Sequence, residues 1–159
     1  MNTNLFNEIV PRNIKGKSTS LEESTTAGTR EEALDTFKRA CKRLLNVKIW
    51  HELIGFGSGK FELTAANGNE MHTLAEIGNF FKIGMPGPGT TSGDGYDWVK
   101  VEKIIVNSNS EGEEESFGMR VRACNSANKH VPPAAYNPYK KWFIVRAAAI
   151  ITAITVSVF

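Results

Sequence analysis

The clearest periodic pattern in the sequence runs from residue 29 to about residue 54, where apolar side chains recur every three to four positions. This spacing is typical of a helix that packs one face on a core. Thr29 and Glu32 form a capping box: the Thr29 hydroxyl is expected to accept from the Glu32 amide, and the Glu32 carboxylate from the Thr29 amide. The pattern predicts an amphipathic helix that ends before Gly55 and leaves a break near Asn46 open. Its stripe consists of Leu34, Phe37, Cys41, Leu44 and Leu45.

Beyond the helix, apolar and polar positions alternate with a period of two, which predicts β-strands. Strands are expected at residues 60–65 and 80–85, with a turn at residues 67–69. Residues 71–77 suit a short helix or a strand equally well. The sequence therefore predicts an α+β fold, with the N-terminal amphipathic helix packed on an antiparallel β-sheet or a small barrel.

A β-hairpin is predicted from residues 96–105 and 117–123. In its first strand, alternation places Val99, Val101 and Ile105 on one face and Lys100 and Glu102 on the other. In its second strand, Arg120 and Arg122 are expected to face outward. The inward positions are Phe117, Met119, Val121 and Ala123.

The two ends of the chain depart from this outline. Residues 1–28 are rich in Ser, Thr, Asn and Lys, which predicts a loosely ordered arm before a single domain at residues 29–159. The tail from Trp142 to Phe159 is almost wholly apolar apart from Arg146. Its alternation after Ile154 favours a core strand. The alternative is a membrane anchor after Lys140 and Lys141, which the charge of Arg146 disfavours.

Composition and charge narrow the class of protein. A length of 159 residues, 41% of them hydrophobic and 23% charged, fits one globular domain. The formal charge of +2 gives no overall field that would attract nucleic acid, so no nucleic-acid partner is expected. The N-terminus has neither a basic segment nor a long apolar stretch, and a cytoplasmic location is therefore expected.

Catalytic and metal-binding patterns are weak in this sequence. The glycine-rich stretch from Gly84 to Gly95 lacks the lysine and the following helix of a phosphate-binding loop. His51, His72 and His130 fall in three segments without zinc-ligand spacing. Cys124 near His130 resembles no cysteine-enzyme signature. No cofactor, metal or catalytic residue is therefore predicted, and an enzyme is the less favoured interpretation.

The most promising surface is the loop at residues 86–98 together with the outer face of the hairpin. The predicted contact residues for a protein or small ligand are Tyr96, Asp97, Trp98, Arg120 and Arg122. Here the aromatic side chains are expected to be exposed beside a basic stripe that includes Lys100. The alternative is a solvated face that Glu102 neutralises locally.

One stretch of the chain resembles a known group of sequences. It comprises Trp50-His51, the Phe-x-Leu-Thr strand at residues 61–64, and PGPG-x-x-x-GDGYDWV at residues 86–99. On these residues the chain resembles a family of small uncharacterised Bacteroidetes proteins. The resemblance implies no activity, cofactor or site residue.

The leading hypothesis is a non-enzymatic interaction or ligand-binding module. The alternatives are a domain tethered to a membrane through Trp142–Phe159, and an enzyme that joins His51 or His72 to Asp94 and Asp97.

Overall fold

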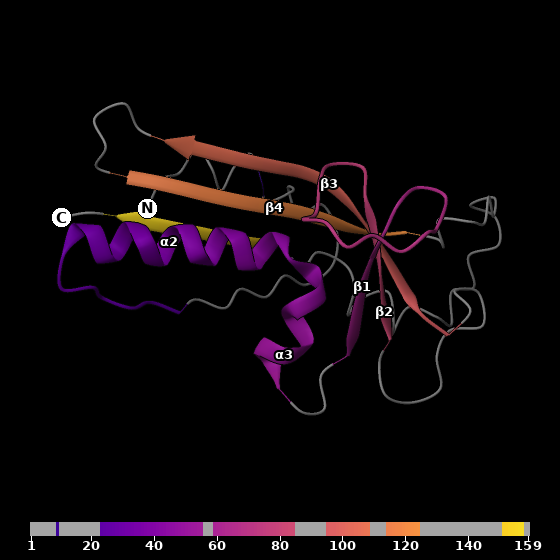
Figure 1. Cartoon of the computed structure of the whole chain (residues 1–159). Helices are drawn as coiled ribbons and strands as arrows, with labels where there is room; N and C mark the ends of the chain where they lie inside the picture. The colour runs from indigo at the N-terminus through magenta and orange to yellow at the C-terminus, as the bar shows by residue number, and fades with distance from the viewer. Residues whose placement is uncertain are drawn as a thin grey trace, which may run out of the picture.

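The computed structural model describes residue 9 and residues 23–55, 59–84, 95–108, 114–124 and 151–157. Most of the predicted N-terminal arm, the loop at residues 86–94 and the first part of the apolar tail lie outside these residues. Figure 1 shows helical segments beside a β-sheet. The elements are α2 (Arg30–Leu45), the 3₁₀ turn η1 (Val47–Ile49), α3 (Trp50–Ile54), β1 (Lys60–Thr64), β2 (Phe80–Gly84), β3 (Asp97–Ser108), β4 (Glu114–Cys124) and β5 (Ile151–Ser157).

The five described strands form one sheet in the order β1-β2-β3-β4-β5, and every neighbouring pair is antiparallel. This confirms the α+β class. Strands β1 and β5 stand at opposite ends of the order and are not paired with each other, so the described strands form an open sheet, not a closed barrel. Strands β1 and β2 accompany only the first part of β3, while β5 pairs with the first part of β4. In Figure 1, β1 and β2 accordingly turn away from the long β3–β4 hairpin.

The start of α2 follows from its cap. Thr29 Oγ1 accepts a hydrogen bond from the Glu32 amide at 3.2 Å, as predicted. The carboxylate of Glu32, however, accepts from the Gly28 amide at 3.0 Å and not from the Thr29 amide. This corrects one half of the predicted capping box, and the result is the same: one more amide at the helix start is satisfied.

The helical region does not run unbroken to residue 54. Helix α2 ends at Leu45, and the Asn46 amide makes a final bond to the Lys42 carbonyl. The turn η1 and the short helix α3 follow at a new angle, which Figure 1 shows clearly. The break near Asn46 that the sequence left open is therefore real, and it lets Trp50 reach the core. The Trp50 ring meets the Phe61 and Phe81 rings edge-on, with centroids 5.5 and 5.4 Å apart.

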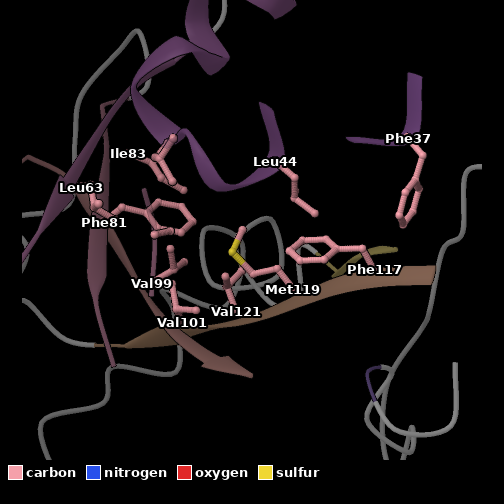
Figure 2. Close-up of a cluster of buried hydrophobic side chains, with 12 residues drawn as sticks. Phe37, Leu44, Leu63, Phe81, Ile83, Val99, Val101, Phe117, Met119 and Val121 are labelled. Carbon is pink, nitrogen blue, oxygen red and sulfur yellow. The ribbon is translucent and has the colours of Figure 1, made fainter. Parts of the chain in front are cut away.

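The hydrophobic core lies between the helices and one face of the sheet. In Figure 2 the Leu44 side chain points from α2 toward the Phe117 ring, and Phe81 lies close to Val99. Each large side chain buried here stabilises the fold by roughly 1.5–3 kcal/mol. The inward positions predicted for β4 are confirmed. The buried cluster consists of Phe37, Leu44, Val47, Leu63, Ala75, Phe81, Ile83, Val99, Val101, Phe117, Met119 and Val121.

A β-bulge interrupts the hairpin between β3 and β4. Val101 pairs with Val121, but the next pair is Lys103 with Arg120, so Glu102 is an extra residue on β3. A one-residue shift moves every later side chain to the other face. Ile104 pairs with Met119 and packs against the core, whereas the sequence predicted Ile105 there. That prediction was wrong because simple alternation does not anticipate a bulge.

The connection between β1 and β2 contains neither a helix nor a named strand at residues 71–77, which resolves the question that the sequence left open. Gly68 adopts φ +82° in the predicted turn, and the Asn69 amide donates to Asn67 Oδ1 at 3.0 Å. The connection is then tied to the end of α2, because the Ala75 amide donates to the Leu45 carbonyl at 2.8 Å.

On the face opposite to α2, residue Ile9 covers part of β4. Gly118 lies between Phe117 and Met119, which face the core, so the position of its missing side chain faces the other way. A Cβ atom on Gly118 would lie 2.8 Å from Ile9 Cγ1, and Ile9 is 0% exposed. Only a glycine at position 118 therefore lets Ile9 approach the strand this closely.

The apolar tail contributes β5, which pairs with β4 from Ile151 opposite Arg120 to Ser157 opposite Glu114. Helix α2 lies next to this strand, as Figure 1 shows. Residues 151–157 of the tail thus form a strand of the sheet. Within the described parts of the chain, no helix combines the length and apolar character needed to cross a membrane.

Candidate functional site

The face of the sheet opposite to α2 is lined by charged side chains. They occupy the strand positions that alternate with the core residues, and cross-strand partners share the same face. We call this surface the charged face. It comprises Lys60, Glu62, Lys82, Lys100, Glu102, Lys103, Arg120 and Arg122. Six cations and two carboxylates lie here, and each carboxylate is the centre of one cluster.

The first cluster surrounds Glu62 on β1. Its carboxylate lies 2.8 Å from Lys60 Nζ and 2.6 Å from Lys82 Nζ. Hydrogen bonds from Lys60 and then Lys82 lower the pKa of Glu62 and outweigh the effect of its burial. Lys82 Nζ also lies 4.9 Å from the centre of the Tyr96 ring, which covers Gly84. The charges of this cluster are largely satisfied by one another.

The second cluster surrounds Glu102, the bulge residue, and we call it the bulge site. Arg122 Nε donates to Glu102 Oε1, and Arg120 Nε lies 3.2 Å from Glu102 Oε2. Arg120 and Glu102 are close enough for an ion pair, but their geometry does not make a hydrogen bond. Arg120 Nε is therefore a buried donor without a hydrogen-bond acceptor among the described residues. The bulge site consists of Glu102 with Lys100, Lys103, Arg120 and Arg122.

The bulge site places like charges directly opposite each other. Lys100 pairs with Arg122, and Lys103 pairs with Arg120, so each cross-strand pair is doubly positive. Like charges in such pairs destabilise a sheet. Glu102 contacts two of these four cations, Arg120 and Arg122, and its side chain is 24% exposed. The Arg122 side chain, by contrast, is 65% exposed, so part of the positive charge reaches solvent.

The bulge itself creates this arrangement. Regular alternation from Val101 would turn Lys103 toward the core, where a charge is costly. The inserted Glu102 moves Lys103 to the charged face, beside Arg120. Sequence reasoning missed this, although a signal was present: Glu102 and Lys103 are two consecutive charges where the alternation from Val99 and Val101 expects an apolar residue at position 103. Bulges often re-aim a side chain at functional sites.

The predicted contact residues do not form one surface. Arg120 and Arg122 belong to the bulge site, and the Tyr96 ring lies beside the Glu62 cluster. Asp97 pairs with Ile83 and therefore lies on the core side of the sheet, and burial raises the pKa of its carboxyl. The structure separates Asp97 from the other four residues.

Trp98 is the clearest correction to the predicted site. It was expected to be exposed in the loop at residues 86–98. Strand β3 begins at Asp97, so Trp98 lies within the sheet between Lys82 on β2 and Cys124 on β4. Its side chain is buried, with 8% exposure. By the strand register Trp98 shares the charged face with Lys82 and Lys100, but its buried side chain offers little surface to a ligand.

The cysteine and histidine side chains with reactive potential lie on separate elements. Burial raises the pKa of the Cys124 thiol to about 11, against a smaller lowering effect of Lys100. His51 Nδ1 lies 2.8 Å from the Lys48 carbonyl oxygen, and His72 Nδ1 lies 3.7 Å from Glu70 Oε1. Three or more metal-ligating side chains do not come together anywhere in the described residues. Asp94 and His130 lie outside those residues.

Comparison with known proteins adds no assignment. A scan against protein-family models, a search of curated proteins and a search of solved structures each return no match. The resemblance of Trp50-His51 and residues 61–64 and 86–99 to a Bacteroidetes family therefore stays a prediction, and function is inferred from the geometry of this chain alone.

Proposed function

We propose that the protein is a non-enzymatic binding module and that the bulge site binds an anionic group of its ligand. The observation that carries this proposal is the two like-charge cross-strand pairs, Lys100 with Arg122 and Lys103 with Arg120, beside the bulge residue Glu102. Such an arrangement opposes the stability of the hairpin. Local violations of this kind are expected where a site serves binding and not folding.

The chemistry of the site favours carboxylate or phosphate. Arginine presents a planar fork of donors that matches both groups, and Glu102 engages only part of each guanidinium. Lys100 adds an exposed ammonium group, which lies 5.6 Å from the centre of the Phe80 ring. An anion that approaches from solvent meets Arg122 and Lys100 first, and its charge relieves the repulsion between them.

A small anion or an acidic protein segment suits this site better than a nucleic acid. The patch is short, because it spans the two cross-strand pairs on either side of one bulge. The whole chain carries a formal charge of only +2, which gives little long-range attraction for a polyanion. Catalysis is disfavoured by the raised pKa of Cys124, the thiol nearest to this patch in the strand register.

The test is calorimetric titration of the full chain with two probes, pyrophosphate for phosphate and citrate for carboxylate. We expect Lys100→Gln combined with Arg122→Gln to weaken binding at least tenfold. Both side chains are exposed, so the double variant should fold normally. The matched control is Arg39→Gln combined with Arg43→Gln, which removes the same charge from α2. Equal weakening by the two double variants, or no binding of either probe, would contradict the proposal.

A further inference from the structure

A groove of about 520 Å³ lies on the other side of the molecule, between α2 and α3. Its α2 wall follows one stripe of the helix at residues 36, 39, 40, 43 and 44, which spans roughly 12 Å at 1.5 Å per residue. Its α3 wall is formed by Trp50 and Leu53. The groove is preformed, because Trp50 Nε1 donates to the Arg43 carbonyl at 3.0 Å and fixes α3 against α2.

The groove combines an apolar floor with a basic edge. Ala40, Leu44, Trp50 and Leu53 supply the apolar surface, and the Leu53 residue is 51% exposed. Arg39 and Arg43 supply the edge, four residues apart and so on the same side of the helix. The Arg39 guanidinium is oriented by a hydrogen bond of 3.1 Å to Thr36 Oγ1.

Charge in this region is of one sign. From Thr36 to Leu45 the helix carries Lys38, Arg39, Lys42 and Arg43, all exposed, and no carboxylate. The acids of α2 are confined to its first two turns. No ion pair joins these four cations to another residue in the part of the chain that the structure describes. The edge of the groove is therefore free to meet acidic groups of a partner.

We infer that this groove docks an acidic amphipathic helix of a protein partner. A helix whose leucine-like side chains repeat every three to four residues would place them beside Leu53 and Ala40. Carboxylates at positions i and i+4 of that helix have the same spacing as Arg39 and Arg43. Charge complementarity selects an acidic occupant, and the apolar floor selects an amphipathic one.

A simpler explanation of the basic residues is that cations near a helix C-terminus interact favourably with the helix dipole. That explanation covers Lys42 and Arg43 in the last turn. The helix dipole does not account for the exposed Leu53 in the opposite wall of the groove. It also does not account for the hydrogen bond that orients the Arg39 guanidinium against Thr36. The two explanations differ in the role of Leu53, which the experiment exploits.

The experiment uses two synthetic 18-residue peptides of identical composition. In the first, leucines repeat at helical spacing and are flanked by glutamates at i and i+4; in the second, the same residues are scrambled. Binding of each labelled peptide to the full chain is measured by fluorescence anisotropy. We expect the helical peptide to bind at least tenfold more tightly than the scrambled one.

Three variants locate the contact. Arg39→Glu combined with Arg43→Glu should weaken binding of the helical peptide at least tenfold, and Leu53→Ala about threefold to tenfold. The control, Lys38→Glu combined with Lys48→Glu, carries the same charge change at two exposed positions outside the groove lining and should leave the affinity within twofold. Equal affinity for the two peptides, equal loss in the control, or no effect of Leu53→Ala would overturn the inference. Circular dichroism of each variant confirms that it is folded.

Discussion

The contact between Ile9 and Gly118 gives the most specific prediction about packing. Ile9 is fully buried, and a Cβ atom at position 118 would lie 2.8 Å from its Cγ1 and 3.0 Å from its Cδ1. Both distances are shorter than the normal contact of two carbon atoms. Gly118→Ala must therefore displace Ile9 or the strand.

The cost follows from two opposing effects. Overpacking by one methyl group costs about 1–3 kcal/mol. Replacing a glycine within a strand recovers about 0.5–1 kcal/mol of backbone entropy. The net loss in the free energy of unfolding for Gly118→Ala is then about 0–2.5 kcal/mol. Ile9→Ala on its own should cost about 2–5 kcal/mol, since it empties a buried site.

The double variant separates this contact from general destabilisation. When Ile9→Ala and Gly118→Ala are combined, the new methyl group enters the space that Ile9 vacates, so the losses should not add. We expect a coupling of about 0.5–3 kcal/mol, measured by urea unfolding of the wild type, both single variants and the double variant.

The matched control for this cycle is Gly84→Ala. A Cβ atom at position 84 would meet the Tyr96 ring at 3.2 Å and has no contact with Ile9 among its nearest neighbours. Gly84→Ala and Ile9→Ala should therefore add to within about 0.5 kcal/mol. Additive losses for Gly118→Ala and Ile9→Ala would show that Ile9 does not lie on β4.

Three further predictions concern the charged face and its support. Hydrogen bonds from two lysines lower the pKa of Glu62 from 4.5, so its stabilising effect is complete above pH 4.5 and lost as the pH falls through the lowered pKa. Glu62→Gln should accordingly cost about 1–2 kcal/mol in urea unfolding at pH 7, and the cost should fall as the pH falls through the lowered pKa. A cost that does not change over the acid range in which the wild type loses stability would refute the ion-pair argument. Trp98→Ala should cost about 3–5 kcal/mol because the side chain is buried; a loss below 1 kcal/mol together with weaker ligand binding would restore Trp98 as a contact residue. With a pKa of about 11, Cys124 should carry roughly 300-fold less thiolate than an ordinary cysteine at neutral pH. In the Cys41→Ser variant, alkylation of Cys124 should therefore be slow until urea unfolds the chain. Fast alkylation of the native state would contradict the burial of Cys124.

Local signals in the sequence predicted the elements that depend on neighbouring residues. The Thr29 cap follows from hydrogen-bonding chemistry within one helical turn, and the inward side chains of β4 follow from strict alternation. The sequence also indicated Arg120 and Arg122 as outward-facing residues, as the structure shows them.

The features that the sequence did not predict depend on long-range contacts. The burial of Trp98 depends on its position between the flanking strands β2 and β4. The local sequence, in which Trp98 follows the polar Asp97, does not indicate this burial. The bulge at Glu102 is a single inserted residue that moves Lys103 and Ile104 to the other face of the strand. A regular period of two along the strand does not predict such an insertion. The approach of Ile9 to Gly118 joins residues far apart in the chain, and a lone glycine in a strand has several explanations.

The central claim is that the bulge site is the anion-binding surface, and amide chemical shifts during titration with pyrophosphate test it most directly. Our account predicts that the largest shift changes occur in β3 and β4 at residues 100–103 and 120–122, and that they disappear in the Lys100→Gln and Arg122→Gln double variant. Shift changes concentrated in α2, or none in either strand up to millimolar pyrophosphate, would contradict it.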